Sequence, residues 1–314
     1  MSGRGRNRGP GSRQPKGGRG RAPGSKSGRR GPAGAGGRPP RRGDGQRGTT
    51  PIRVADEGRG GGHLGGEQIE GRHAVRELLM AGTRRTREVI LAGDLDPAPI
   101  LDDIIDLADE QKVTIREIAR SKFESMTRTD GAQGVVATAQ PLRPTPLEEL
   151  LEPERDGTPP FLLLLDGITD PGNLGGILRT AECAGVTGVV LPRHRAAHVT
   201  PTVAKAAAGA IEHLRLAVVG GLPAAMTSLG RAGIWTVGLD AGGDRDLFDL
   251  PVAGEPVALA LGAEGPGLSR LVRERCDTVA SIPLAGVLGS LNVSNAAAVA
   301  VYEITRRRAL DVGS

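Results

Sequence analysis

The pattern of apolar and polar positions divides the chain near residue 66. Before that point apolar residues are almost absent, so this stretch cannot offset the entropy of ordering and is expected to be disordered. After it, short apolar runs bounded by turn residues alternate with stretches in which apolar residues recur at helical spacing. The pattern therefore predicts a disordered tail over residues 1–66 followed by a folded α/β part.

Residues 67–140 are predicted to form a small α/β domain. The helical pattern covers residues 72–81, 100–112 and 121–127, and the strand pattern covers residues 88–91, 113–118 and 134–139. Six prolines follow within residues 141–160. Because proline at that density prevents a continuous helix or a central strand, we interpret this stretch as a linker with one helical turn at residues 147–151.

Residues 161–314 show a longer alternation of strand and helix patterns. The five apolar residues 161–165 are typical of a strand that is buried on both faces. Such alternation predicts a parallel sheet covered by helices on both sides. The predicted strands are 161–165, 188–191, 216–219, 234–239, 257–261 and 278–283, and the predicted helices are 174–184, 200–210, 222–232, 268–276 and a last helix capped by Ser294.

Three loops of this second domain combine glycines with polar side chains. They read DPGNLGGILRT from residue 170, LGAEGPGLS from residue 261 and IPLAGVLGSLNVSN from residue 282. The last loop precedes a helix N-terminus, where backbone N–H groups and the positive end of the helix dipole favour a bound ligand. No G-x-G-x-x-G opens a helix after the first strand, so a Rossmann-type nucleotide enzyme is kept only as an alternative.

Taken together, these loops resemble the motifs of the SpoU (TrmH-like) family of S-adenosylmethionine-dependent RNA ribose 2′-O-methyltransferases. The matching patterns are N-x-G-x-x-x-R-T at residues 173–180, G-x-E-G-x-G at residues 262–267, and I-P-x-x-G followed by S-L-N-V-S at residues 282–294. Each pattern alone is weak, but all three at plausible separations form a strong signal. The resemblance covers about residues 67–308.

The resemblance implies a specific fold. Residues 161–314 would form a SPOUT-type α/β catalytic domain with a C-terminal trefoil knot, a topology that periodicity cannot reveal. The opening I-E-G-R-H-A-V at residues 69–75 resembles the start of the substrate-binding domain found before many such catalytic domains. That domain has an L30e-like α/β fold in the family and helps to select RNA. A stabilising or dimerising appendage is the alternative for residues 67–140.

The resemblance also implies roles for individual residues. Arg179 would act on the ribose 2′-hydroxyl. Since a guanidinium stays protonated at physiological pH, placing a phosphate and lowering the pKa of that hydroxyl is favoured over acting as the base. Asn292 and Ser290 would orient a hydroxyl or hold their loop, while Glu264 would order the loops or hold Asn173. The residues expected to contact S-adenosylmethionine are Gly262, Ile282, Leu291, Gly238 and Leu239.

Charge is distributed unevenly along the chain. Residues 1–50 contain fourteen Lys or Arg and one acid, a net charge of +13, whereas the whole chain carries +5. The remainder is therefore acidic, with a net charge of about −8, so the basic total does not indicate an RNA-binding surface throughout. The RGR and GGRG repeats of the tail resemble RGG-type segments, which bind nucleic acid loosely. A solubilising leader without a specific partner fits them equally well.

The remaining features exclude other classes of protein. No apolar run approaches the length of a membrane span, and no apolar region follows the basic start as in a signal peptide. Cys183 and Cys276 lack metal-ligand spacing and indicate a reducing, cytoplasmic environment. We therefore expect a cytoplasmic enzyme without a metal.

The predicted activity is methylation of a ribose 2′-hydroxyl in RNA, with S-adenosylmethionine as the cofactor. Relatives with two domains mostly modify 23S rRNA, so a guanosine of 23S rRNA is favoured as the target. The alternatives are an adenosine target, a tRNA 2′-O-methyltransferase, and a non-catalytic RNA-binding or ribosome-assembly factor. A homodimer is expected from the resemblance. The small residues Ala296, Ala297, Ala298 and Ala300 offer a helix face that allows close approach of another helix, but such a face can equally pack inside one subunit.

Overall fold

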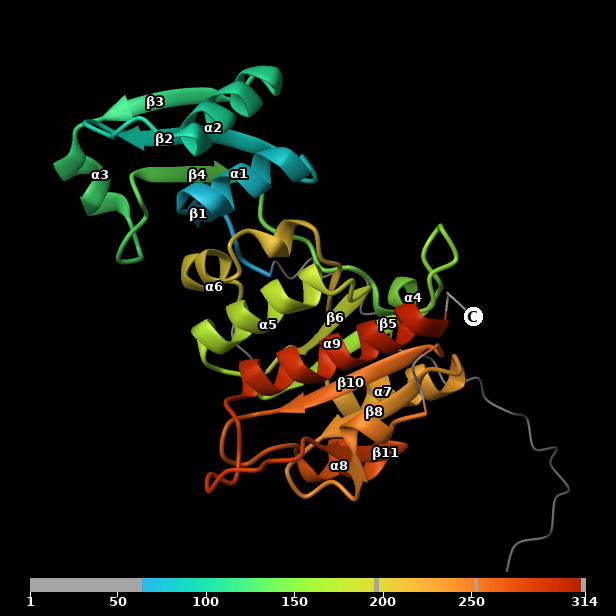
Figure 1. The fold of residues 1–314 in the computed structure, drawn as a ribbon. Helices are drawn as coiled ribbons and strands as arrows, with labels where there is room; N and C mark the ends of the chain where they lie inside the picture. The colour runs from blue at the N-terminus through green and yellow to red at the C-terminus, as the bar shows by residue number, and fades with distance from the viewer. Residues whose placement is uncertain (1–63, 195–197, 252–253, 312–314) are drawn as a thin grey trace, which may run out of the picture. The chain divides into compact units, whose positions relative to one another are not determined.

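The computed structural model describes residues 64–194, 198–251 and 254–311. Within these residues the strands form one sheet of four strands and one of seven (Figure 1). Of the predicted tail, residues 1–63 lie outside the described residues. Residues 64–66 already belong to the folded part, because Leu64 is buried and its N–H donates to the Leu142 carbonyl at 3.1 Å.

The first domain is a mixed sheet with helices on both faces. Its elements are β1 (Gln68–Glu70), α1 (Arg72–Ala81), β2 (Thr86–Ala92), α2 (Pro99–Glu110), β3 (Thr114–Ile118), α3 (Arg120–Met126) and β4 (Val135–Ala139). The strand order is β1-β4-β2-β3, in which only β2 and β3 are parallel. Leu78 of α1 and Ile104 of α2 belong to the core on one face, and Phe123 of α3 belongs to the core on the other. All six predicted elements are present, and the three-residue strand β1 was not predicted.

The second domain contains the seven-stranded sheet. Its elements are α4 (Leu147–Leu150), β5 (Phe161–Asp166), α5 (Pro171–Cys183), β6 (Gly188–Pro192), α6 (Pro201–Ala206), η1 (Ala210–Glu212), β7 (Leu216–Val219), α7 (Leu222–Arg231), β8 (Trp235–Leu239), β9 (Arg245–Asp246), η2 (Leu247–Asp249), β10 (Val257–Gly262), α8 (Arg270–Arg275), β11 (Thr278–Ser281) and α9 (Val293–Asp311). The strand order is β7-β6-β5-β10-β8-β11-β9, and every neighbouring pair is parallel. The predicted parallel α/β domain is confirmed, while the trefoil knot stays a prediction.

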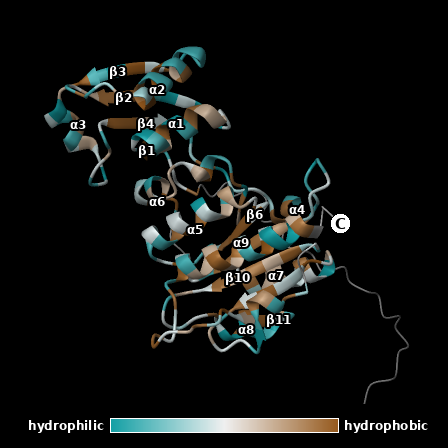
Figure 2. Ribbon diagram, viewed as in Figure 1, coloured by the Kyte–Doolittle hydropathy of each residue, from teal (hydrophilic) through white to brown (hydrophobic). Residues whose placement is uncertain are grey.

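Strand β5 shows why this sheet is covered on both faces. Successive side chains of a strand point to opposite faces, and here every one of them is apolar up to Asp166. Leu163 belongs to the core that includes residues of α5 and α9, whereas Leu162 and Leu164 belong to the core that includes residues of α7 and α8. Figure 2 shows the hydrophobic strands between helices whose outer residues are more polar. The buried strand predicted from residues 161–165 is therefore confirmed.

Two helices differ from their predicted extents. Helix α5 begins at Pro171, three residues before the predicted start, because the Asp170 side chain accepts the N–H of Asn173 at 2.7 Å and proline is favoured at the first helical position. The helix predicted at 200–210 ends at Ala206 instead. Gly209 has a φ of 86°, a left-handed conformation that leads into the separate turn η1.

For two residues of the alanine face, the structure favours packing inside one subunit over a dimer contact. Ala297 and Ala300 are fully buried in the core of their own domain. The residues of α9 that are exposed include Val299 and Tyr302. The small side chains of α9 therefore allow it to pack closely within one subunit.

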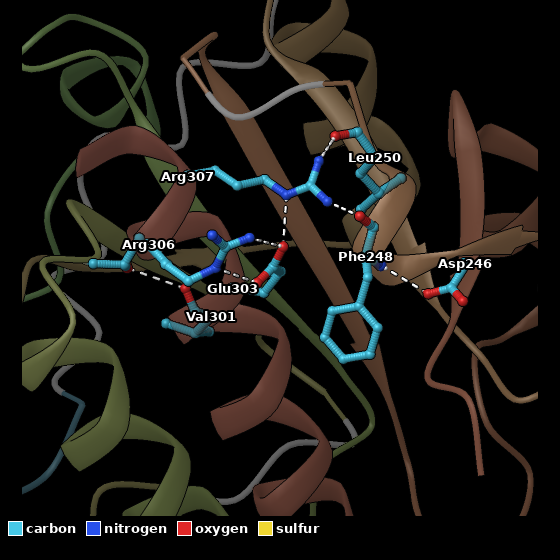
Figure 3. A network of polar contacts seen from close by, with 8 residues as sticks. Asp246, Phe248, Leu250, Val301, Glu303, Arg306 and Arg307 are labelled. Carbon is cyan, nitrogen blue, oxygen red and sulfur yellow. Dashed lines mark hydrogen bonds and ion pairs between the residues drawn. The ribbon is translucent and has the colours of Figure 1, made fainter. Parts of the chain in front are cut away.

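The C-terminal half of α9 is attached to the segment that follows β9 by a network of charged side chains (Figure 3). Arg306 and Arg307 both donate to the carboxylate of Glu303, at 2.9 Å and 2.6 Å. Arg307 also donates to the carbonyls of Phe248 and Leu250. The guanidinium groups of Arg306 and Arg307 lower the pKa of Glu303 to about 2.

This network makes the contribution of Glu303 to stability dependent on pH. Glu303→Gln is expected to lower the free energy of unfolding at pH 7 by about 1–3 kcal/mol, because the charge-assisted hydrogen bonds from Arg306 and Arg307 are weakened. The folded-state pKa lies below the usual value of 4.5, so this contribution is complete above pH 4.5 and is lost as the pH falls toward 2. Urea unfolding of both proteins between pH 7 and pH 3 measures the difference.

Glu274→Gln is the control for this experiment. Glu274 pairs with Arg270, and both side chains are largely exposed, so its replacement is expected to change stability by less than about 0.5 kcal/mol. A Glu303→Gln effect that stayed constant down to pH 3 would contradict the assigned pKa.

Candidate active site

Three loops of the second domain meet through polar side chains. Asn173 of α5 donates from Nδ2 to Oε1 of Glu264, which follows β10, at 3.0 Å. Asn292, which precedes α9, donates from Nδ2 to the same oxygen at 2.7 Å and to Oδ1 of Asn173 at 2.9 Å. The three residues, here called the polar cluster, come from the three separate sequence motifs. The structure thus shows Glu264 holding Asn173, while their catalytic roles stay predictions.

Asn292 also caps helix α9. Its Oδ1 accepts the backbone N–H of Ser294 at 2.8 Å and that of Asn295 at 3.4 Å, as expected for the residue before a helix. The prediction that Ser294 is the cap is wrong, since Ser294 is the second residue of the helix and its own hydroxyl donates to Asn292 at 2.6 Å. The position of the polar cluster is therefore tied to the start of α9.

A cavity of about 490 Å³ lies beside the polar cluster. Four of the five residues predicted to contact the cofactor line it, namely Leu239, Gly262, Ile282 and Leu291. Of the predicted catalytic residues, Glu264, Ser290 and Asn292 line it too. Other lining residues are Asp240, Ala241, Leu261, Ala263, Gly265, Pro266, Gly267, Leu284, Val293 and Ala296. The cavity therefore combines apolar side chains with the backbone of glycine-containing loops.

Gly238 is the predicted cofactor residue that lies elsewhere. A Cβ atom at this position would come within 2.8 Å of Leu268 Cδ1 and 3.0 Å of Cys276 Sγ. Gly238 is thus required for close packing against Leu268 and Cys276. A cofactor contact by Gly238 stays a prediction.

One edge of the cavity depends on a close approach of two backbone segments. A Cβ atom on Gly262 would lie 2.1 Å from the carbonyl carbon of Gly267, so no larger residue fits at position 262. Gly267 itself has a φ of 67°, which favours glycine. These glycines bring main-chain groups, rather than side chains, to the edge of the cavity.

Asp240 is a residue of the cavity that the sequence reasoning missed. Its Oδ1 accepts the N–H of Gly242 at 2.9 Å and pairs with Arg273 of α8 at 2.8 Å, while Arg273 also donates to the carbonyl of Gly242 at 2.8 Å. Burial raises the pKa of Asp240, but these hydrogen bonds outweigh burial and the pKa is lowered overall. The available signal was an acid placed directly after a predicted strand.

Arg179 is not part of the polar cluster. It lies on α5 six residues after Asn173, which corresponds to about 120° around the helix. The side chain is exposed, does not line the cavity, and makes no hydrogen bond or ion pair with the described residues. The structure therefore brings Asn173, Glu264 and Asn292 together and leaves Arg179 outside.

The structure describes the ranges 64–194, 198–251 and 254–311. No group of three or more His, Cys, Asp or Glu side chains there is placed to hold a metal ion. None of the helices there is both long enough and apolar enough to cross a lipid bilayer.

Comparison with protein families matches both domains. Residues 160–302 match the model described as "SpoU rRNA Methylase family", and residues 68–145 match "RNA 2'-O ribose methyltransferase substrate binding".

Individual relatives agree with these family matches. The chain is 39% identical over 246 residues to the 23S rRNA (guanosine-2'-O-)-methyltransferase RlmB of Pseudomonas putida, which covers 77% of this chain and 97% of that protein. It is 36% identical over 251 residues to the protein of the same name from Photobacterium profundum, covering 78% and 99% of the two chains. Among solved structures, it is similar to the SpoU methyltransferase AviRb from Streptomyces viridochromogenes in complex with AdoMet, with a TM-score of 0.65, 28% identity, and coverage of 77% and 90%.

The double role of Asn292 leads to a stability prediction. Asn292→Ala is expected to lower the free energy of unfolding by about 1–2 kcal/mol, because α9 loses its cap and Glu264 loses a donor. Asn295→Ala is the matched control, since this exposed side chain makes no hydrogen bond with the described residues and its replacement is expected to matter by less than about 0.5 kcal/mol. Equal urea midpoints for the two variants would show that Asn292 does not fix the start of α9.

Proposed function

This chain belongs to the SpoU rRNA methylase family, and we propose that it transfers a methyl group from S-adenosylmethionine to a ribose 2′-hydroxyl of RNA. The observation that carries the proposal is the contact of Asn173, Glu264 and Asn292 beside the cavity. Each of these residues comes from a different family motif. The polar cluster is therefore complete in a chain whose relatives are named as RNA methyltransferases.

The cavity fits an adenosine that carries a sulfonium side chain. Leu239, Ile282 and Leu291 provide apolar surface for a ring, and the backbone at residues 262–267 supplies hydrogen-bonding groups for the edge of a base. A backbone edge of this kind requires glycine at position 262, because a Cβ atom there would lie 2.1 Å from the carbonyl carbon of Gly267. When bound, S-adenosylmethionine would supply an activated methyl group.

The residues of the chain then have to align the ribose 2′-oxygen with the methyl group and allow the hydroxyl proton to leave. Both polar atoms of the Asn292 side chain are already engaged, with the helix N-terminus and with the other two members of the polar cluster. Asn292 therefore holds its loop in place. Ser290 lines the cavity and makes no hydrogen bond with the described residues, so its hydroxyl is the better candidate for orienting the substrate hydroxyl.

We assign Arg179 to the RNA. Its guanidinium is exposed and has no ion-pair partner in the described part of the chain, which suits contact with a phosphate of a bound strand. A positive charge near the 2′-oxygen also stabilises the negative charge that develops there during transfer.

The position of Arg179 supports a homodimer as part of the proposal. Since Arg179 does not line the cavity of its own chain, it would complete the cavity of a partner subunit, as the family resemblance implies. Exposed apolar residues offer a surface for this contact. Val299 and Tyr302 of α9 are 37% and 49% exposed, and Val287 and Leu288, in the loop before α9, are almost fully exposed.

A guanosine of 23S rRNA is the proposed target, because the relatives from Pseudomonas putida and Photobacterium profundum are both named as 23S rRNA guanosine methyltransferases. The match to an RNA substrate-binding domain over residues 68–145 supports an RNA held at two places. A tRNA target is the alternative. The complete polar cluster weighs against a non-catalytic factor.

The free thiols of Cys183 and Cys276 fit the proposed cytoplasmic location.

The cofactor and the role of Arg179 are tested together. Calorimetric titration is expected to show binding of S-adenosylmethionine and no binding of NAD. Arg179→Ala is expected to reduce methyl transfer by about 100-fold or more and to leave the affinity for S-adenosylmethionine unchanged, because Arg179 lies outside the cavity. Arg231→Ala, an exposed arginine on α7, is the control and should retain activity. Binding of NAD without S-adenosylmethionine would overturn the proposed activity.

The proposed dimer predicts complementation between two inactive variants. Leu291→Asp places a charge in the cavity and is expected to prevent cofactor binding, whereas Arg179→Ala leaves the cavity intact. Mixing equal amounts after dissociation should restore about a quarter of wild-type methyl transfer, because half of the random dimers then contain one complete site. Light scattering reports the oligomeric state. A fully active monomer, or a mixture as inactive as its components, would contradict a shared site.

A further inference from the structure

A second cavity, of about 510 Å³, lies within the small domain. Three segments line it: the start of α1 at Arg72, residues 94–96 between β2 and α2, and residues 127–134 between α3 and β4, together with α3 residues such as Arg120. It is separate from the cavity of the catalytic domain, and the two cavities share no lining residue.

The loops around this second cavity are held in place by a buried carboxylate. Glu70 is fully buried, and its oxygens accept the N–H groups of Arg128 and Thr129 at 2.7 and 2.9 Å and the Thr129 hydroxyl at 2.6 Å. A buried carboxylate is tolerated only with such a full set of donors. Arg72, the first residue of α1, donates from Nε to the carbonyl of Gln133 at 3.0 Å and so ties the loop before β4 to this helix. The cavity is therefore preformed.

Two lining residues adopt a backbone conformation that is uncommon for residues other than glycine. Asp94 and Gln133 have φ values of 63° and 54°, in the left-handed region that non-glycine residues seldom occupy and that is often found at binding sites. Beside them, Leu95 packs onto Gly134, where a Cβ atom would lie 2.2 Å from Leu95 Cδ2. Leu95 and Phe123 supply apolar surface to the same cavity.

The charges of the cavity restrict its ligand. The residues that line it include two arginines, Arg72 and Arg120, and three acids, Asp94, Asp96 and Glu124. A phosphate alone would be repelled by the carboxylates. A metal ion is disfavoured, since no metal-holding group of side chains occurs in the described residues. The carboxylates form no hydrogen bond or ion pair with that part of the chain, so they are available to a ligand that offers N–H donors.

We propose that this second cavity binds one unpaired guanine of the RNA, distinct from the nucleotide that is methylated. Guanine has two adjacent donors, N1–H and the N2 amino group, which suit a carboxylate, and two adjacent acceptors, O6 and N7, which suit a guanidinium. Adenine, cytosine and uracil lack this combination. Sequence-specific recognition of RNA commonly reads such unpaired bases against apolar or guanidinium surfaces.

Asp94 and Arg120 are the pair that reads the base. Arg120 Nη2 donates to the backbone carbonyl of Asp94 at 3.2 Å, which places the guanidinium beside Asp94 and leaves the carboxylate free. The inference rests on the proposed function only in taking RNA as the ligand.

The test is binding of the full chain to two labelled decauridylates, one with a single central guanosine and one with a central adenosine. Fluorescence anisotropy is measured at one salt concentration, so that any binding by the basic tail affects both strands equally. The guanosine strand is expected to bind at least about fivefold more tightly. Asp94→Asn and Arg120→Ala should each abolish this preference. Asparagine tolerates the left-handed conformation, so the first variant preserves the loop.

Asp106→Asn is the matched control, because Asp106 is exposed on α2 outside the cavity lining, and it should keep the preference. Equal affinity of the wild-type protein for both strands, binding of neither, or a preference that survives both cavity variants would overturn the inference. The anisotropy experiment involves no methyl transfer. A chain that prefers guanosine but binds no S-adenosylmethionine would refute the proposed function alone.

Discussion

The catalytic domain depends on the side-chain amide of Asn292. Its oxygen caps α9, and its nitrogen donates to Glu264 and Asn173. One residue therefore fixes the start of the last helix relative to the loops that follow β5 and β10. Because all three loops leave the carboxyl ends of parallel strands, a single hydrogen-bonded cluster is enough to define one side of the cavity.

The other side of the cavity is fixed by different means. Gly262 allows the loop after β10 to fold back closely, because a Cβ atom at this position would lie only 2.1 Å from the carbonyl carbon of Gly267. Arg273 binds both Asp240 and the backbone of Gly242. The cavity is thus enclosed by main-chain groups and apolar residues whose positions are set before any ligand arrives. Preorganisation of this kind lets binding energy serve alignment of the reacting atoms rather than ordering of loops.

Periodicity in the sequence predicted most of the fold, and physical reasons explain the rest. Alternating strand and helix patterns identified the parallel sheet, because its strands are apolar on both faces. The two-residue strand β9 is too short to leave a pattern. The cap of α9 was assigned to Ser294 instead of Asn292, since both are good capping residues and only the backbone geometry distinguishes them. The buried state of Ala297 and Ala300 depends on tertiary packing, which composition does not report.

The candidate site was predicted mainly through family motifs. These identified Asn173, Glu264 and Asn292, whose contacts join positions 28, 91 and 119 residues apart and cannot be inferred from local spacing. Asp240 was missed because its partner Arg273 is distant in the chain and belongs to no motif. Gly238 was predicted to contact the cofactor, and in the structure it packs against Leu268 and Cys276. A glycine at a strand end serves ligand approach and close packing equally well, so sequence alone does not separate the two.

The central claim, methylation of RNA by this site, is tested most directly by mapping ribose methylation across total RNA. Cells lacking the gene are compared with cells that carry the wild-type gene or Arg179→Ala. The account predicts that one guanosine mark in 23S rRNA is absent without the gene, returns with the wild-type protein and does not return with the variant. An unchanged methylation map would contradict the claimed activity, and a lost mark in tRNA would contradict the proposed 23S rRNA target.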